Sequence, residues 1–170
     1  MKKRIADIVV DFLADKGVTD CFTVVGGGAM HLNDAFGHSD RIHCTYNHHE
    51  QACAMAAESY ARLNNKIAAV CVTTGPGGTN AITGVVGGWL DSIPMFIISG
   101  QVRYDTTARY GEQFTQGYPL RSVGDQEFDV VKSVECMTKY ATMIEDPKQI
   151  KYALEKAYYL ATTGDQVLYG

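Results

Sequence analysis

Three glycine-rich segments are the positions at which this sequence could bind a ligand. They cover residues 26–28, 75–78 and 100–101, and each follows a short apolar run. In open α/β sheets, ligands bind at the carboxyl ends of the strands, where such loops lie. Backbone N–H groups in a glycine loop can hold phosphate, so nucleotide binding is the first chemistry to test.

The segment 75–80 fails that test on its spacing. It nearly matches the dinucleotide pattern G-x-G-x-x-G, but Asn80 occupies the last glycine position. Pro76 also removes one backbone donor, and the sequence contains no Walker pattern G-x-x-x-x-G-K-[ST]. Nucleotide binding is therefore a weak hypothesis, and tight turning is the structural alternative for these glycines.

The cysteines and histidines do not form a recognisable metal pattern. The five cysteines contain no C-x-x-C pair, and the spacing of His38, His43 and His48 matches no zinc site. An odd number of cysteines, three of them in apolar runs, favours buried free thiols in a reducing compartment. We therefore expect a cytoplasmic protein without metal ligands of its own.

Alternating helices and strands are expected to position the glycine segments. Apolar residues at helical spacing predict a helix over 3–16 that ends at Gly17. Further helices are expected over 29–36, 49–62 and 147–162, and a short one from Asp125. Short apolar runs predict strands over 21–25, 41–46, 67–72, 94–99, 139–143 and 166–169.

Two loops interrupt this alternation. Residues 73–80 are expected to form a glycine loop that leads into a helix ending near Leu90, and residues 100–124 are expected to form a long irregular loop. Long loops in compact domains are often functional. The whole pattern predicts one α/β domain over residues 1–170, an open, mostly parallel sheet with helices on both faces.

Composition excludes several classes of partner. Hydrophobic residues make up 46% of the 170 residues, charged residues 20%, and the formal net charge is −4. This is the balance of a globular protein without a basic surface for nucleic acid. No apolar run approaches the roughly 20 residues that cross a bilayer, so we expect no membrane partner.

Six segments in order resemble the N-terminal pyrimidine-binding (Pyr) domain of the thiamine-diphosphate-dependent acetolactate synthase and 2-oxo acid decarboxylase superfamily. Together they extend over nearly the whole chain, and their order and spacing make the resemblance specific. The segments are VVGGGA (24–29), HEQACAMAAESYAR (49–62), TGPGGTN (74–80), WLDSIP (89–94), SGQV (99–102) and QEFD (126–129).

The resemblance implies a catalytic role for Glu50, which occupies the position of the acid in the family's H-E-Q-A-A type motif. That glutamate shares a proton with N1′ of the cofactor's pyrimidine, which allows the cofactor's own 4′-amino group to remove the C2 proton. Glu50 also begins a predicted helix, where the dipole stabilises a carboxylate, so capping is the structural alternative. His49 precedes it as in relatives, with packing or catalysis equally open.

The resemblance also implies cofactor contacts. Val24, Val25 and Gly26 align with the segment that lines the pyrimidine ring through main-chain and apolar contacts. Pro76 and Asn80 stand where the family's GPGATN-type motif approaches the cofactor.

Gln126 matches the glutamine of the family's F-Q-E motif, which faces the reacting centre. Gly78 replaces the usual alanine of the preceding motif, and Asp125 replaces the phenylalanine before Gln126. The first choice of function is acetolactate synthase, which decarboxylates a 2-oxo acid such as pyruvate and ligates the two-carbon product. A simple 2-oxo acid decarboxylase, a polysaccharide-pathway relative and a non-catalytic assembly domain remain alternatives.

Complete members of the family carry a middle domain and a diphosphate-binding domain with a GDG…N magnesium motif, which neither GDQ (124–126) nor GDQ (164–166) supplies. We therefore expect Mg²⁺ and the diphosphate to be held outside this chain, which would be an N-terminal piece or a separate Pyr subunit. The expected assembly is a dimer. The isolated domain is expected to be inactive.

Overall fold

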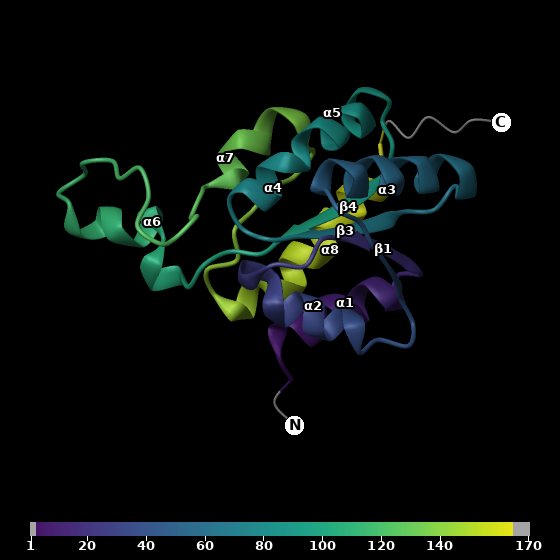
Figure 1. Cartoon of the computed structure of the whole chain (residues 1–170), viewed down its shortest axis with the longest axis horizontal. Coiled ribbons are helices and arrows are strands. Elements are labelled where there is room, and N and C mark those ends of the chain that lie inside the picture. The colour runs from purple at the N-terminus through teal and green to yellow at the C-terminus, as the bar shows by residue number, and fades with distance from the viewer. Residues whose placement is uncertain (1–2, 165–170) are drawn as a thin grey trace.

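The computed structural model describes residues 3–164 as a parallel sheet between two layers of helices (Figure 1). The strand order is β2-β1-β3-β4, and all neighbouring strands run parallel. This confirms the expected α/β architecture with helices on both faces. The strands are β1 (Asp20–Thr23), β2 (His43–Tyr46), β3 (Ala68–Val72) and β4 (Met95–Ser99).

One face of the sheet is covered by α1 (Ile5–Asp15), α2 (Met30–Gly37) and α8 (Ile150–Thr162), the lower layer in Figure 1. Leu13 of α1 is fully buried there, and the chain leaves α1 through Gly17 in the left-handed conformation, with φ +82°. A glycine adopts this conformation without steric cost, which explains the stop expected from the sequence.

The opposite face is covered by α3 (Glu50–Asn64), α4 (Pro76–Asn80), α5 (Ile82–Leu90) and α7 (Val130–Val134). Helices α3 and α5 approach until their backbones nearly touch, because a Cβ added at Gly84 would lie 2.6 Å from the Cβ of Ala54. All five residues of β3 are buried, since the strand packs against both layers.

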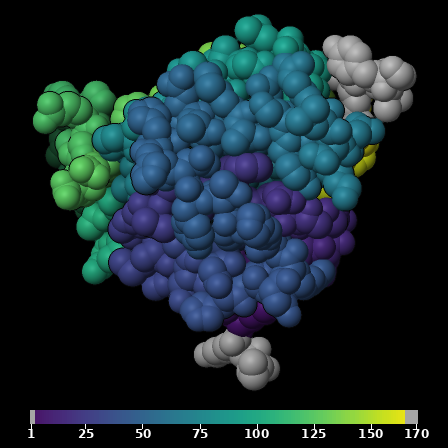
Figure 2. Space-filling model, turned by 45° about the vertical axis from the view of Figure 1, so that its right-hand side comes forward, coloured from purple at the N-terminus to yellow at the C-terminus, as the bar shows by residue number. Residues whose placement is uncertain are grey.

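Residues 100–129 form an arm that stands off one side of the molecule (Figure 1 and Figure 2). The arm contains α6 (Ala108–Gly111) between two short 3₁₀ helices, Tyr104–Thr106 and Glu112–Phe114. Arg109 anchors it, because the guanidinium donates to Asp129 over 2.9 Å and to Glu145 over 3.2 Å. The long loop expected at 100–124 is therefore present, but short helical turns interrupt it.

Two expected element boundaries are wrong. Residues 76–80 form α4 rather than a loop, since Pro76 takes the first helical position, where a missing N–H is harmless. The helix expected from Asp125 begins at Val130, because Gln126 has a positive φ of +55° and Asp129 is the N-cap.

The strand expected over 139–143 is also wrong, because this segment makes no strand pairing in the structure. It packs near the end of α8 instead. Lys139 Nζ donates to the carbonyl of Thr163 over 2.8 Å, and Lys156 lies over the ring of Tyr140. The strand expected over 166–169 lies outside the described residues.

Cysteine burial matches the expectation only in part. Cys21, Cys53 and Cys71 are buried free thiols, whereas Cys44 is half-buried and Cys136 is exposed. Within residues 3–164, no helix is both long and apolar enough to cross a membrane.

Candidate functional site

The candidate site lies at the carboxyl ends of β1 and β3, in the middle of the sheet. From β1 the chain crosses to β2 on one side, whereas from β3 it crosses to β4 on the other. Loops that diverge in this way mark the point where open α/β sheets bind ligands. The glycine segments at 26–28 and 75–78 therefore occupy the expected position.

The glycines of these segments let the loops after β1 and β3 pack directly against each other. A Cβ added at Gly26 would lie 2.5 Å from Thr73 Cβ, and one at Gly28 would lie 2.7 Å from Thr74 Cγ2. Distances this short are not tolerated between carbon atoms. Close packing, more specific than simple turning, is thus the reason these positions are glycine.

The third glycine segment and the QEFD segment join the same cluster. Gly75 has φ +56°, and a side chain there would collide with the carbonyl group of Gln126. Gly100 packs in the same manner on the carbonyl of Gly28. The backbone of the arm therefore returns to the site, which places residue 126 directly beside the glycine loop after β3.

Gln101 fixes this return through three hydrogen bonds. Its side-chain oxygen accepts from Thr74 Oγ1 over 2.6 Å and from the Val102 N–H over 2.9 Å. Its amide nitrogen donates to the Phe128 carbonyl over 2.9 Å. Gln101 thus connects the loop after β3 to the QEFD segment.

Glu50 is the first residue of α3 and lies against α4. His49 is the N-cap, with Nδ1 accepting from the Gln51 N–H over 3.2 Å. Glu50 Oε2 accepts a hydrogen bond from Asn80 Nδ2 over 3.0 Å, while Oε1 would lie 3.4 Å from a Cβ at Gly77. The side-chain capping contact of α3 therefore belongs to His49, and the half-buried carboxyl of Glu50 is held toward the glycine loop.

Thr73 lies between the Gly26 and Gly77 backbones. Its methyl carbon would be 2.6 Å from a Cβ at Gly77, and its Oγ1 would be 2.7 Å from one at Gly26. Oγ1 is buried, and it is the one such side-chain atom among the described residues that has no hydrogen-bond partner. A buried unpaired hydroxyl costs roughly 1–3 kcal/mol, so the close packing of these loops is obtained at the expense of one hydrogen bond.

The structure gathers most, but not all, of the expected site residues. Gly26 packs on Thr73, which in turn packs on Gly77 beside Glu50. Asn80 donates to Glu50, and Pro76 begins the helix that carries Asn80. Within residues 3–164, the other three expected residues form no hydrogen bond with Glu50. Val24 is half-buried over the core of the α3 layer, and Val25 is 61% exposed just beyond β1. The side chain of Gln126 is exposed.

Sequence analysis placed Thr73 and Gln101 within the expected ligand loops but named neither of them as a site residue. Both directly follow the ends of strands, Thr73 one residue and Gln101 two residues beyond them. A threonine or glutamine at such a position is a weak signal, but it was available. The role of each depends on contacts with loops far away in the sequence.

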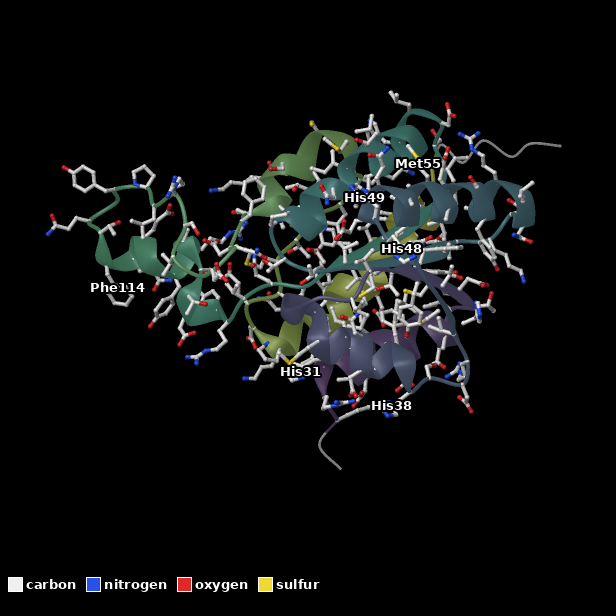
Figure 3. The ribbon with its side chains drawn as sticks, in the orientation of Figure 1. His31, His38, His48, His49, Met55 and Phe114 are labelled. Atoms are coloured by element: carbon white, nitrogen blue, oxygen red, sulfur yellow. The ribbon has the colours of Figure 1, made fainter. Side chains whose placement is uncertain are left out.

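The histidines do not converge on this site or on a metal. His31 and His38 lie on the α2 side of the sheet, whereas His48 and His49 lie near the start of α3 (Figure 3). Over residues 3–164, no group of three or more histidine, cysteine, aspartate or glutamate side chains is arranged to hold a metal ion.

Comparison with known proteins identifies the family. Residues 3–120 match the family model described as "Thiamine pyrophosphate enzyme, N-terminal TPP binding domain". The chain is 36% identical over 159 residues to the acetolactate synthase large subunit of Haemophilus influenzae, covering 94% of this chain and 26% of that protein.

Two further relatives give the same result. Identity is 34% with the chloroplastic acetolactate synthase of Arabidopsis thaliana and 34% with the acetolactate synthase isozyme 3 large subunit of Escherichia coli. Each match covers 94% of this chain but 22% and 25% of the relative, so the chain spans about a quarter of their length. The resemblance carried by the six sequence segments is thus confirmed: the chain belongs to the family of thiamine pyrophosphate enzyme N-terminal TPP-binding domains.

Proposed function

We propose that this chain binds the pyrimidine half of thiamine diphosphate, and that Glu50 is the catalytic acid of an acetolactate synthase-like enzyme. The observation that carries the proposal is the hydrogen bond from Asn80 to Glu50 beside Gly77. It orients the carboxyl toward the loops at the carboxyl ends of β1 and β3. A carboxyl that is fixed in this way can share a proton with a ring nitrogen of a bound heterocycle.

The remaining residues fit a flat heterocycle that is polar at its edge. Val25 offers an exposed apolar side chain just after β1, and Gly26 offers backbone without a side chain. The Glu50 carboxyl beside Gly77 adds a polar group held by Asn80. Apolar contact on a ring face with a few fixed polar groups is the usual composition of a cofactor pocket.

Each residue has a defined task in this proposal. Glu50 holds and returns the proton at the pyrimidine N1′, and Asn80 positions Glu50 through its Nδ2–Oε2 hydrogen bond. Val24, Val25, Gly26 and Pro76 shape the surface on which the ring would rest, and Gln126 faces the reacting centre. Thiamine diphosphate, when bound, supplies the chemistry that removes CO₂ from a 2-oxo acid such as pyruvate.

The complete enzyme would add the partners that this proposal needs. By family resemblance, Mg²⁺ and the diphosphate would be held by a separate diphosphate-binding domain, and the isolated chain would be inactive.

A dimer is supported by exposed apolar side chains on the adjacent helices α3 and α5. Met55 and Trp89 are each 42% exposed, and Leu90 is 74% exposed. Such surface is commonly covered by a partner.

The proposal is tested by Glu50→Gln in the complete enzyme. Glutamine keeps the size and can accept from Asn80, but it cannot exchange a proton. Turnover should fall by about 10²–10⁴-fold, the usual contribution of a positioned acid–base group. Hydrogen–deuterium exchange at C2 of the bound cofactor should slow in parallel. The melting temperature should change little, because a carboxylate in a first turn contributes at most about 1 kcal/mol.

The matched control is Glu155→Gln, which removes an exposed carboxyl from α8 on the opposite face. This control should retain full turnover and exchange. If Glu50→Gln also keeps near-native exchange and turnover, Glu50 does not serve as the catalytic acid and the proposed site is wrong.

A further inference from the structure

Cys21 and Cys44 are direct neighbours across the sheet. They are register partners in the parallel pair of β1 and β2. Adjacent strands lie about 4.7–4.9 Å apart, and disulfides join residues whose Cα atoms are about 4.4–6.8 Å apart. Both side chains belong to the core between the sheet and the α1, α2 and α8 layer, so they point to the same face. The backbone therefore allows a bond between them.

The two thiols differ in their access to solvent. Cys21 is completely buried, whereas Cys44 is half-buried on β2, which lies at one edge of the described sheet. Cys44 also lines an open cavity of about 510 Å³, together with Arg41, His43 and Tyr46. A small reagent can thus reach Cys44 from outside, whereas Cys21 is closed to solvent.

Their electrostatic environments differ in a complementary way. A hydrogen bond from Cys21 lowers the pKa of the Cys44 thiol against the opposing effect of burial, and a further hydrogen bond from Tyr46 lowers it as well. The same contact with Cys44, together with burial, raises the pKa of Cys21. The lowered pKa favours the thiolate of Cys44, which is the nucleophilic form.

The other buried cysteines lack this combination. Burial raises the pKa of Cys53 and raises that of Cys71 to about 12. Cys53 also lies on the opposite face of the sheet, in the core under α3 and α5. Cys21 and Cys44 are therefore distinguished from them by register, access and charge state together.

We propose that Cys21 and Cys44 form a reactive thiol pair that a hydroperoxide oxidises to a disulfide between β1 and β2. The Cys44 thiolate attacks one peroxide oxygen, the O–O bond breaks, and Cys44 becomes a sulfenic acid. The Cys21 sulfur then attacks the Cys44 sulfur, the S–O bond breaks, and hydroxide leaves with the Cys21 proton as water. With hydrogen peroxide, two thiols lose two electrons and two protons, and two waters form.

The experiment treats the reduced, purified protein with hydrogen peroxide. Remaining thiols are then blocked with iodoacetamide as the protein is denatured, and the unreduced protein is digested with trypsin. Cleavage after Lys16, Arg41 and Arg62 places Cys21 in peptide 17–41 and Cys44 in peptide 42–62. We expect these two peptides to be linked, at a mass two hydrogens below their sum.

Two variants assign the link, because peptide 42–62 also contains Cys53. The link should persist in Cys53→Ser and disappear in Cys44→Ser, where Cys21 should be recovered in its alkylated form. Circular dichroism checks that both variants fold. If Cys44→Ser does not fold, fragmentation of the linked wild-type peptides assigns the bonded cysteine directly.

Three results would overturn the proposal. The first is oxidation confined to the exposed Cys136, and the second is a link that survives Cys44→Ser. The third is conversion of Cys44 to its sulfinic acid without any link to Cys21. None of these readouts depends on cofactor binding or on Glu50, so the proposed catalytic function can fail or stand independently.

Discussion

Replacing Gly77 with alanine tests whether the glycines of the site are required by close packing. Gly77 is the second residue of α4, and a Cβ there would lie 2.6 Å from Thr73 Cγ2. The remaining neighbours are tolerable, since Thr73 Cβ would be 3.5 Å away and Glu50 Oε1 3.4 Å. One methyl group of Thr73 therefore accounts for most of the conflict.

Two opposing effects determine the expected magnitude. Overpacking by one methyl group costs about 1–3 kcal/mol, whereas alanine is favoured over glycine in a helix by up to about 1 kcal/mol. With an overpacking cost of about 2 kcal/mol and a helix gain of up to about 1 kcal/mol, Gly77→Ala should lower the free energy of unfolding by roughly 1–2 kcal/mol. For a chain of this size, each kcal/mol corresponds to about 2–4 °C in the melting temperature.

Gly87→Ala is the matched control, because Gly87 lies within α5 and a Cβ there would meet no atom within 4 Å. This variant should raise the free energy of unfolding by about 0.4–1 kcal/mol, by reducing the freedom of the unfolded chain. Two glycine-to-alanine changes in neighbouring helices should therefore shift stability in opposite directions. Urea denaturation monitored by circular dichroism measures both.

Thr73→Ser provides the rescue. Serine lacks Cγ2 and leaves Thr73 Cβ at an ordinary contact distance of 3.5 Å from the new Cβ at position 77. The free energy of unfolding of the double variant should then exceed the value predicted from the sum of the single effects by at least about 1 kcal/mol. If Gly77→Ala stabilises the protein as Gly87→Ala does, or if the two changes at 73 and 77 are additive, the close-packing explanation is wrong.

Two further predictions concern the arm and the helix surface. Burial alone would raise the pKa of Asp129, but hydrogen bonds from Arg109 hold it below its ordinary value. The stability from Asp129 is therefore fully present above its unfolded pKa of about 3.9 and is lost as pH falls through the lower folded pKa. Asp129→Asn should thus destabilise the protein at pH 7, and the difference from wild type in urea denaturation should shrink as the pH falls below about 3.9. Trp89→Lys should weaken self-association in sedimentation equilibrium, whereas Tyr152→Lys on the opposite layer should not; equal effects would place the interface elsewhere.

The fold was predictable from sequence where the signal was local. The continuous apolar run at 67–72 predicted β3, and the alanine-rich segment at 49–62 predicted α3, because burial on two faces and helix propensity are readable along the chain. Pro76 and Asp129 could have corrected the starts of α4 and α7, since proline at N1 and aspartate at the N-cap are local signals too.

The remaining features depend on distant partners. Residues 139–143 have a strand-like composition, yet a strand requires a neighbour, and Lys139 and Tyr140 instead contact residues of and just beyond α8. The roles of Thr73 and Gln101 likewise arise only when loops 25 or more residues apart meet. Glu50 could be nominated through a motif, but its hydrogen bond with Asn80 crosses 30 residues and required the structure.

The backbone contact between Gly84 and Ala54 has a consequence for how a ligand would be received. With no long side chain between them, α3 and α5 cannot slide or rotate past each other by repacking rotamers. Ala54 lies one helical turn after Glu50, so the height of the acid above the sheet is set in advance. An incoming ring would meet a carboxyl whose backbone is already fixed, so that less conformational entropy would be lost on association.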